Sequence, residues 1–139
     1  MRTALIVDAG PLVAYFDRDS EHHTWVREQA ARLPAGWLTC EAALAEAAFL
    51  FPRARVDPDR LFELLERGLL AIPFRVEEEV GALRQLLSKY RNLPMSLADA
   101  CLVRLSELYE DCTVFTLDSH FTVYRRFGRR TIPLLFTPS

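Results

Sequence analysis

Short apolar runs alternate with longer amphipathic segments along this chain of 139 residues. Runs without polar alternation are typical of strands that are buried on both faces. The pattern predicts strands at residues 3–7, 37–39, 70–76, 113–117 and 132–136. Because helical segments separate them, we expect one α/β domain spanning residues 1–139, a three-layer α/β/α sandwich with a mainly parallel central sheet.

Polar and proline signals mark where the helices begin. Pro11, three residues after Asp8, and Pro58, directly after Asp57, each suit the first turn of a helix. Ser20 and Thr39 are predicted caps of two further helices. The turn at residues 34–36, Pro-Ala-Gly, should close the second helix. The predicted helices cover approximately residues 9–16, 21–33, 40–51, 58–68, 77–90, 96–109 and 119–127.

Composition narrows the class of protein. Half of the residues are hydrophobic and 26% are charged, as in ordinary globular proteins, and no apolar run is long enough to span a membrane. The stretch before Asp8 is too short for a signal peptide, so we expect a cytoplasmic protein without membrane association. Cys40, Cys101 and Cys112 form no CxxC pair and are predicted to be reduced, buried thiols.

Four carboxylates interrupt or end otherwise apolar runs. They are Asp8, Glu46, Asp99 and Asp118. The first and last follow predicted strands, and ligands of open α/β sheets bind beyond such strand ends, so the four can converge there. A lone buried carboxylate costs several kcal/mol unless it is paired, protonated or bound to a cation. We therefore predict a shared cation, and ligands that are all oxygen favour Mg²⁺ or Mn²⁺.

Three of these acids have a simpler alternative role as helix caps. Asp8 and Asp118 each precede a predicted helix, and the spacing of Ser96 and Asp99 fits a capping box. Glu46 resists this interpretation, because it lies too deep in its helix to cap it and has no Lys or Arg within four residues.

One dense basic stretch follows the last acid. Its arginines are candidate contacts to phosphate groups, with a solvated loop as the alternative: Arg125, Arg126, Arg129 and Arg130. The net charge of −2 does not by itself indicate binding of nucleic acid. His120 is expected to pack against aromatic side chains, whereas His22 and His23 are expected at the surface.

The segments around the four acids together resemble PIN-domain nucleases, most closely the VapC-like toxins of type II toxin–antitoxin systems. These segments are Leu5-Ile6-Val7-Asp8-Ala9-Gly10-Pro11-Leu12-Val13-Ala14, Ala45-Glu46-Ala47, Leu97-Ala98-Asp99-Ala100 and Thr116-Leu117-Asp118-Ser119-His120-Phe121. By that resemblance, the four acids form the catalytic metal site, with Thr116 in support. Many relatives carry Ser or Thr where this chain has Gly10.

The resemblance also implies an activity and partners. It implies an endoribonuclease that cleaves single-stranded or structured RNA with a water activated by Mg²⁺ or Mn²⁺, with a cognate antitoxin as protein partner and a homodimer as the usual form. The alternatives are a PIN-like module that binds RNA or protein without cutting, and a housekeeping PIN nuclease without an antitoxin. An aspartyl phosphatase is disfavoured, because it needs an acid at Gly10 and a catalytic lysine, and Lys89 is the only lysine.

Overall fold

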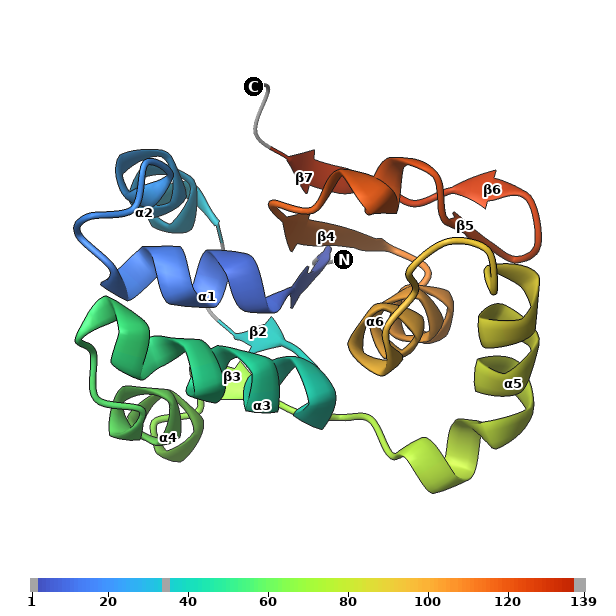
Figure 1. The fold of residues 1–139 in the computed structure, drawn as a ribbon, viewed down its shortest axis with the longest axis horizontal. Coiled ribbons are helices and arrows are strands. Elements are labelled where there is room, and N and C mark those ends of the chain that lie inside the picture. Colours follow the sequence, from blue (N-terminus) through green and yellow to red (C-terminus); the bar gives the residue numbers. More distant parts are fainter. Residues whose placement is uncertain (1–2, 34–35, 137–139) are drawn as a thin grey trace.

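The fold is a parallel sheet between two groups of helices, in a computed structural model that describes residues 3–33 and 36–136 (Figure 1). The strands of the sheet are β1 (Ala4–Val7), β2 (Trp37–Leu38), β3 (Leu70–Ala71), β4 (Cys112–Thr116) and β7 (Leu134–Phe136). Their order is β3-β2-β1-β4-β7, and every neighbouring pair is parallel. The predicted α/β class with a parallel sheet is therefore confirmed.

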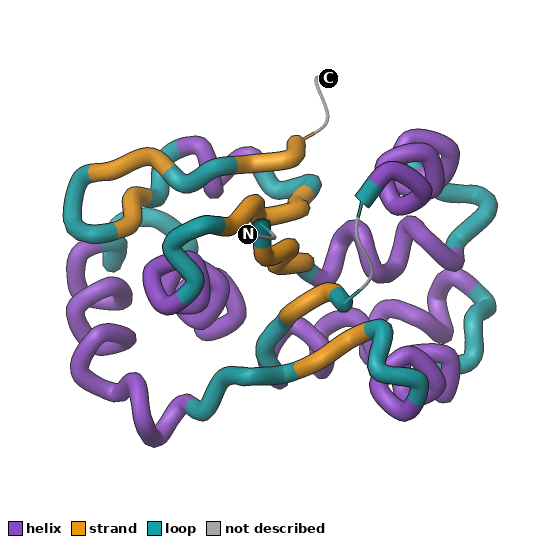
Figure 2. The backbone as a smooth tube through the Cα atoms, turned by 180° about the vertical axis from the view of Figure 1, so that it is seen from behind, coloured by secondary structure: helices purple, strands orange, loops and turns teal. Residues whose placement is uncertain are grey.

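Helices cover both faces of the sheet, as Figure 2 shows from behind. They are α1 (Ala9–Phe16), α2 (His23–Arg32), α3 (Glu41–Leu50), α4 (Asp59–Glu66), α5 (Val80–Lys89) and α6 (Leu97–Leu108), with short 3-10 helices η1 (Phe51–Ala54), η2 (Val76–Glu79) and η3 (Ser119–Thr122). Helices α1, α2 and α4 pack against one face, whereas α5 and α6 pack against the other. Helix α3 contacts both α1 and α6.

Successive side chains of the central strands point to opposite faces of the sheet and contribute to two separate hydrophobic cores. Leu5, Val7 and Phe115 belong to the core under α1, α2 and α4. Ile6 and Val114 belong to the core under α5 and α6. Because successive strand residues point to opposite faces, two fully apolar strands supply both cores at once. The residue that follows such a strand then lies at the carboxyl end of the sheet.

Two helix caps differ from the sequence prediction. Helix α2 begins at His23, and Ser20 instead accepts a hydrogen bond from the His22 N–H in the preceding turn. Helix α3 is capped by Cys40, whose Sγ accepts from the Ala43 N–H. The hydroxyl of Thr39 is fully buried and donates to the Val7 carbonyl at 2.8 Å, because a buried carbonyl at a strand end needs a donor.

The strand predicted at 70–76 and the helix predicted at 119–127 are wrong in extent. Strand β3 stops at Ala71, because it is an edge strand and the nearby Pro73 cannot donate to a sheet. The second segment forms only η3, followed by an antiparallel hairpin of β5 (Arg125–Arg126) and β6 (Arg130–Thr131). Three residues, 127–129, connect its strands, and two of them, Phe127 and Gly128, have the positive φ angles (53° and 84°) that tight hairpin loops use.

The structure also bears on the predictions for the cysteines, the fifth helix, the turn at residues 34–36 and membrane-spanning segments. The three cysteines are buried free thiols, as predicted. The helix predicted at 77–90 begins as the 3-10 turn η2 before α5. Residues 34 and 35 of the predicted closing turn lie outside the described residues. None of the helices in the described part of the chain is long and apolar enough to cross a membrane.

Candidate active site

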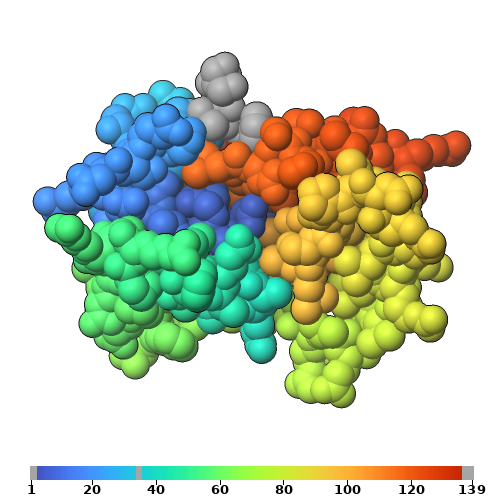
Figure 3. All heavy atoms as spheres, in the orientation of Figure 1, coloured from blue at the N-terminus to red at the C-terminus, as the bar shows by residue number. Residues whose placement is uncertain are grey.

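Four acids from four separate segments line one cleft of about 520 Å³. Asp8 lies between β1 and α1, Glu46 on α3, Asp99 in the first turn of α6, and Asp118 between β4 and η3. The starts of α1, α3 and α6 lie next to one another near the centre of the face in Figure 3. The structure thus brings together the acids that the sequence separates by up to 110 positions (118 − 8).

Asp8 both caps α1 and faces the cleft. Its Oδ1 accepts a hydrogen bond from the Ala9 N–H at 2.7 Å, and its Oδ2 accepts one from the Thr116 hydroxyl at 2.9 Å. Burial raises the pKa of Asp8 to about 6; the charges of Asp99 and Glu46 add to this rise, while the two hydrogen bonds oppose it. The capping role and a role in the cleft are therefore compatible at this residue.

Thr116 connects Asp8 with Asp118. Its fully buried hydroxyl donates to Asp8 and accepts a hydrogen bond from the Asp118 N–H at 3.0 Å. The Oδ1 of Asp118 accepts from the N–H of His120 at 2.9 Å and lies 2.8 Å from His120 Nδ1. Because both acids share one hydroxyl, their positions at the ends of β1 and β4 are linked.

Asp99 completes a capping box with Ser96. The Ser96 N–H donates to Asp99 Oδ2, and the Asp99 N–H donates to Ser96 Oγ, each at 3.0 Å. Sequence reasoning missed a third contact, the hydroxyl of Tyr124, which donates to Asp99 Oδ2 at 3.1 Å. No local pattern signals this contact, because 25 residues separate the two side chains.

Glu46 is not buried, contrary to the sequence argument. It is exposed on α3, as are its neighbours Ala45 and Phe49, so the apolar run does not mark an interior position here. Partial burial still raises the pKa of Glu46, and the charges of Asp99 and Asp118 raise it further. Glu46 therefore lines the cleft from an exposed position.

The donor chemistry of the cleft suits a hard divalent cation. Among residues 3–33 and 36–136, no Lys or Arg lines the cleft to offset the four carboxylates. Within residues 3–33 and 36–136, no three His, Cys, Asp or Glu side chains are already arranged to hold a metal ion. The carboxylates repel one another in this arrangement, and a cation with oxygen ligands would relieve that repulsion.

The basic stretch divides into interior and exposed arginines. Arg126 is buried, and its guanidinium donates to the carbonyls of Ser106 at 2.9 Å and Glu110 at 2.8 Å, so its predicted contact with RNA is replaced by a structural role. Arg125 donates to the Thr122 carbonyl at 2.8 Å and is partly buried. Arg129 and Arg130 are exposed on the hairpin.

The histidines differ in their surroundings. The ring of His120 stacks on Tyr124 with a centroid distance of 6.4 Å, as its predicted aromatic packing implies, and it also lines the cleft. His22 and His23 are partly buried instead of lying at the surface, and His23 Nδ1 is 2.7 Å from the Ala14 carbonyl.

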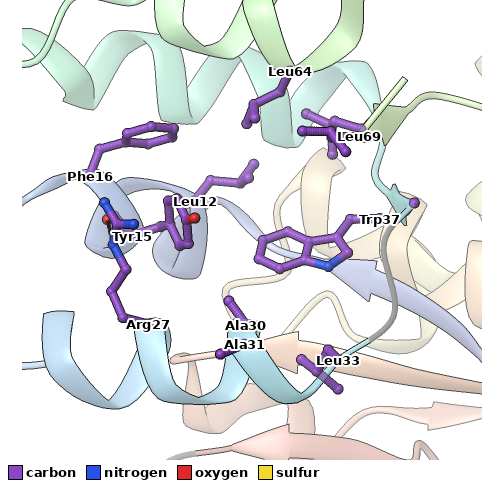
Figure 4. Close-up of a pocket in the computed structure, with 12 residues that line it drawn as sticks. Leu12, Tyr15, Phe16, Arg27, Ala30, Ala31, Leu33, Trp37, Leu64 and Leu69 are labelled. Atoms are coloured by element: carbon purple, nitrogen blue, oxygen red, sulfur yellow. Dashed lines mark hydrogen bonds between the residues drawn. The ribbon is translucent and has the colours of Figure 1, made fainter. Parts of the chain in front are cut away.

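A second pocket has a different character (Figure 4). It measures about 360 Å³ and is lined mainly by apolar side chains of α1, α2 and α4, with the Trp37 ring among them. Of the described residues that line it, Arg27 alone is charged, and none is an acid. The pocket therefore offers no ligands for a hard cation, and the acidic cleft is the candidate active site.

The sequence matches the PIN domain family over residues 5–126, which include all four acids. The chain belongs to the PIN-domain family. It is also similar to Ribonuclease VapC26 of Mycobacterium tuberculosis (strain ATCC 25618 / H37Rv), with 28% identity over 127 residues, covering 89% of this chain and 94% of that protein. The resemblance to VapC-like PIN-domain proteins is thereby confirmed.

Proposed function

We propose that this protein is an endoribonuclease that uses Mg²⁺ or Mn²⁺ bound in the acidic cleft. The proposal rests on one observation: four carboxylates from four segments line one cleft, and no Lys or Arg is among the described residues that line it. The similarity to a protein named as a ribonuclease supports RNA as the substrate class.

Three acids would hold the cation directly or through water: Asp8, Glu46 and Asp99. Because no ready ligand set exists among the described residues, their side chains would have to draw closer when the ion binds. A bound ion would supply the charge that activates a water nucleophile and stabilises the leaving oxygen of an in-line displacement at phosphorus.

The chain's own residues have complementary tasks in this proposal. Thr116 would hold Asp8 and Asp118 at a fixed spacing, because its hydroxyl forms hydrogen bonds with both residues. Asp118, at the end of β4, would orient either the same ion or one that arrives with the substrate. Glu46, which is exposed, would accept the proton of the attacking water if it holds the ion through that water and not directly.

Incubation of the purified protein with labelled single-stranded RNA tests the activity. We expect cleavage fragments with Mg²⁺ or Mn²⁺ and none with excess EDTA, because the carboxylates alone lack the required positive charge. RNA binding without cleavage under all these conditions would select the non-catalytic binding module. Cleavage that persists in EDTA would contradict the metal mechanism.

The exposed arginines of the β5–β6 hairpin are the proposed phosphate contacts. Changing both Arg129 and Arg130 to Ala should weaken binding of single-stranded RNA and reduce the slope of log affinity against log salt by about 0.7 for each lost contact. Arg126→Ala is the matched control: it should lower the free energy of unfolding by about 1.5–3 kcal/mol, by removing charged hydrogen bonds, without changing the salt slope.

Fluorescence anisotropy across a salt series, together with urea unfolding, separates these two roles. An unchanged salt slope in the Arg129/Arg130 double variant would remove the hairpin from the RNA interface.

We also propose a toxin role with a cognate antitoxin as partner, and a homodimer. Large apolar side chains exposed on α3 and α4 support protein contacts, namely Phe49 at 66% and Phe62 at 54% exposure. The apolar pocket of Figure 4 is a further surface that a partner side chain could fill. Co-purification with the product of an adjacent gene, and the mass in solution, test the two interactions. A housekeeping nuclease would show no such partner.

A further inference from the structure

Two stacked rings, those of His120 and Tyr124, contact two of the four acids in the cleft. The Tyr124 hydroxyl donates to Asp99 Oδ2 at 3.1 Å, and His120 Nδ1 lies 2.8 Å from Asp118 Oδ1. The ring centroids are 6.4 Å apart, and the planes differ by 24°. The acids on α6 and after β4 are thus connected through one aromatic unit.

The Tyr124 ring is itself held firmly in the interior. It is fully buried in the core under α5 and α6. Phe121 and Tyr90 pack edge to face against it, with centroid distances of 5.3 Å and 5.1 Å. Because aromatic neighbours fix the ring, the hydroxyl is held at one place beside Asp99.

The hydroxyl also determines which oxygen of Asp99 is free. Oδ2 accepts two hydrogen bonds, one from the Ser96 N–H and one from Tyr124. Within the part of the chain that the structure describes, Oδ1 has no hydrogen-bond donor. A carboxylate held through one oxygen presents the other in a defined direction, and such supporting hydrogen bonds orient metal ligands in proteins.

We infer that Tyr124 is a positioning residue of the proposed metal site. Its hydroxyl orients Asp99, and its ring, stacked on His120, sets the spacing between Asp99 and Asp118. This inference rests on the proposed function and deepens it. The competing possibility is that the Ser96 cap alone positions Asp99, in which case the Tyr124 hydroxyl contributes only to stability.

Mn²⁺ binding by the full chain without RNA tests the inference. Tyr124→Phe removes only the hydroxyl and should weaken Mn²⁺ affinity by about 10–100-fold, the usual effect of losing a supporting hydrogen bond to a metal ligand. Electron paramagnetic resonance of free Mn²⁺ measures the affinity. RNA cleavage by the variant should recover as Mn²⁺ is raised, because the substitution weakens ion binding and leaves all four acids in place.

Tyr90→Phe is the matched control. Tyr90 is also buried and contacts the same ring, but its hydroxyl accepts from the Arg125 N–H at 2.8 Å. This variant should keep the Mn²⁺ affinity of the unaltered protein. Equal losses in both tyrosine variants would overturn the inference, because they would reflect general loosening of the core.

The remaining outcomes are also distinct. Mn²⁺ affinity within twofold of the unaltered protein in Tyr124→Phe overturns the inference and leaves the nuclease proposal standing. If the unaltered protein neither binds Mn²⁺ nor cleaves RNA, the proposed function fails, and the inference fails with it. If Tyr124→Phe does not fold, His120→Phe, which keeps a ring beside Tyr124, is compared with His120→Ala, which removes it, and equal Mn²⁺ affinity in these two variants would overturn the inference.

Discussion

Asp99→Asn should yield a folded protein whose metal-dependent RNA cleavage falls by at least about a hundredfold. The amide oxygen of Asn can still accept from the Ser96 N–H and the Tyr124 hydroxyl, so the cap of α6 survives. The lost charge removes a metal ligand, and a bound ion supplies several kcal/mol of charge stabilisation in the transition state. Asp8→Asn should behave in the same way.

Asp57→Asn is the matched control for these substitutions. Asp57 also accepts a backbone hydrogen bond at the start of a helix, from the Asp59 N–H at 3.0 Å, but it lies outside the cleft. Cleavage rates with saturating Mg²⁺ and circular dichroism compare the three variants. Full activity in purified Asp8→Asn or Asp99→Asn would refute the assignment of these acids to the active site.

The second large effect is a loss of stability as pH rises in the absence of divalent metal. Burial raises the pKa of Asp8 from 3.8 in the unfolded chain to about 6 in the fold. Between these values the folded state binds more protons than the unfolded state, so the free energy of unfolding falls with increasing pH. The pKa difference corresponds to about 3 kcal/mol, fully present below pH 4 and lost once pH exceeds about 6.

Urea unfolding in EDTA, from pH 4 to pH 8, measures this effect. The difference in unfolding free energy between the natural chain and Asp8→Asn isolates the contribution of Asp8 from those of other titrating groups. We expect the natural chain to lose stability relative to Asp8→Asn as pH rises, because Asp8 becomes charged and Asn does not. A difference that is constant across the series would contradict the raised pKa of Asp8. Adding Mn²⁺ at pH 7 should restore stability to the natural chain by binding the folded state.

Local chemistry made much of the architecture predictable. The apolar runs that form β1 and β4 are buried on both faces, and the residue that follows β1 caps the next helix. The capping box at Ser96 and Asp99 could be predicted from a spacing of three residues. These features depend on neighbours within one turn or one strand, where propensity and hydrogen bonding act directly.

Predictions that depended on surroundings were less successful. Glu46 stands in an apolar run but is exposed, because α3 carries apolar residues on its solvent side as well. Arg126 stands in a basic run but is buried, because carbonyls from α6 and the loop after it accept hydrogen bonds from its guanidinium. In both cases a residue's sequence neighbours are a poor guide to its neighbours in space.

The sequence by itself determined the α/β class, the parallel sheet and the resemblance to PIN domains, because periodicity and short motifs are local properties. Only the tertiary structure decided that the four acids share one cleft, that Thr116 joins Asp8 to Asp118, and that Tyr124 reaches Asp99. These contacts form between residues up to 108 positions apart, so they exist only once the strands and helices have packed together.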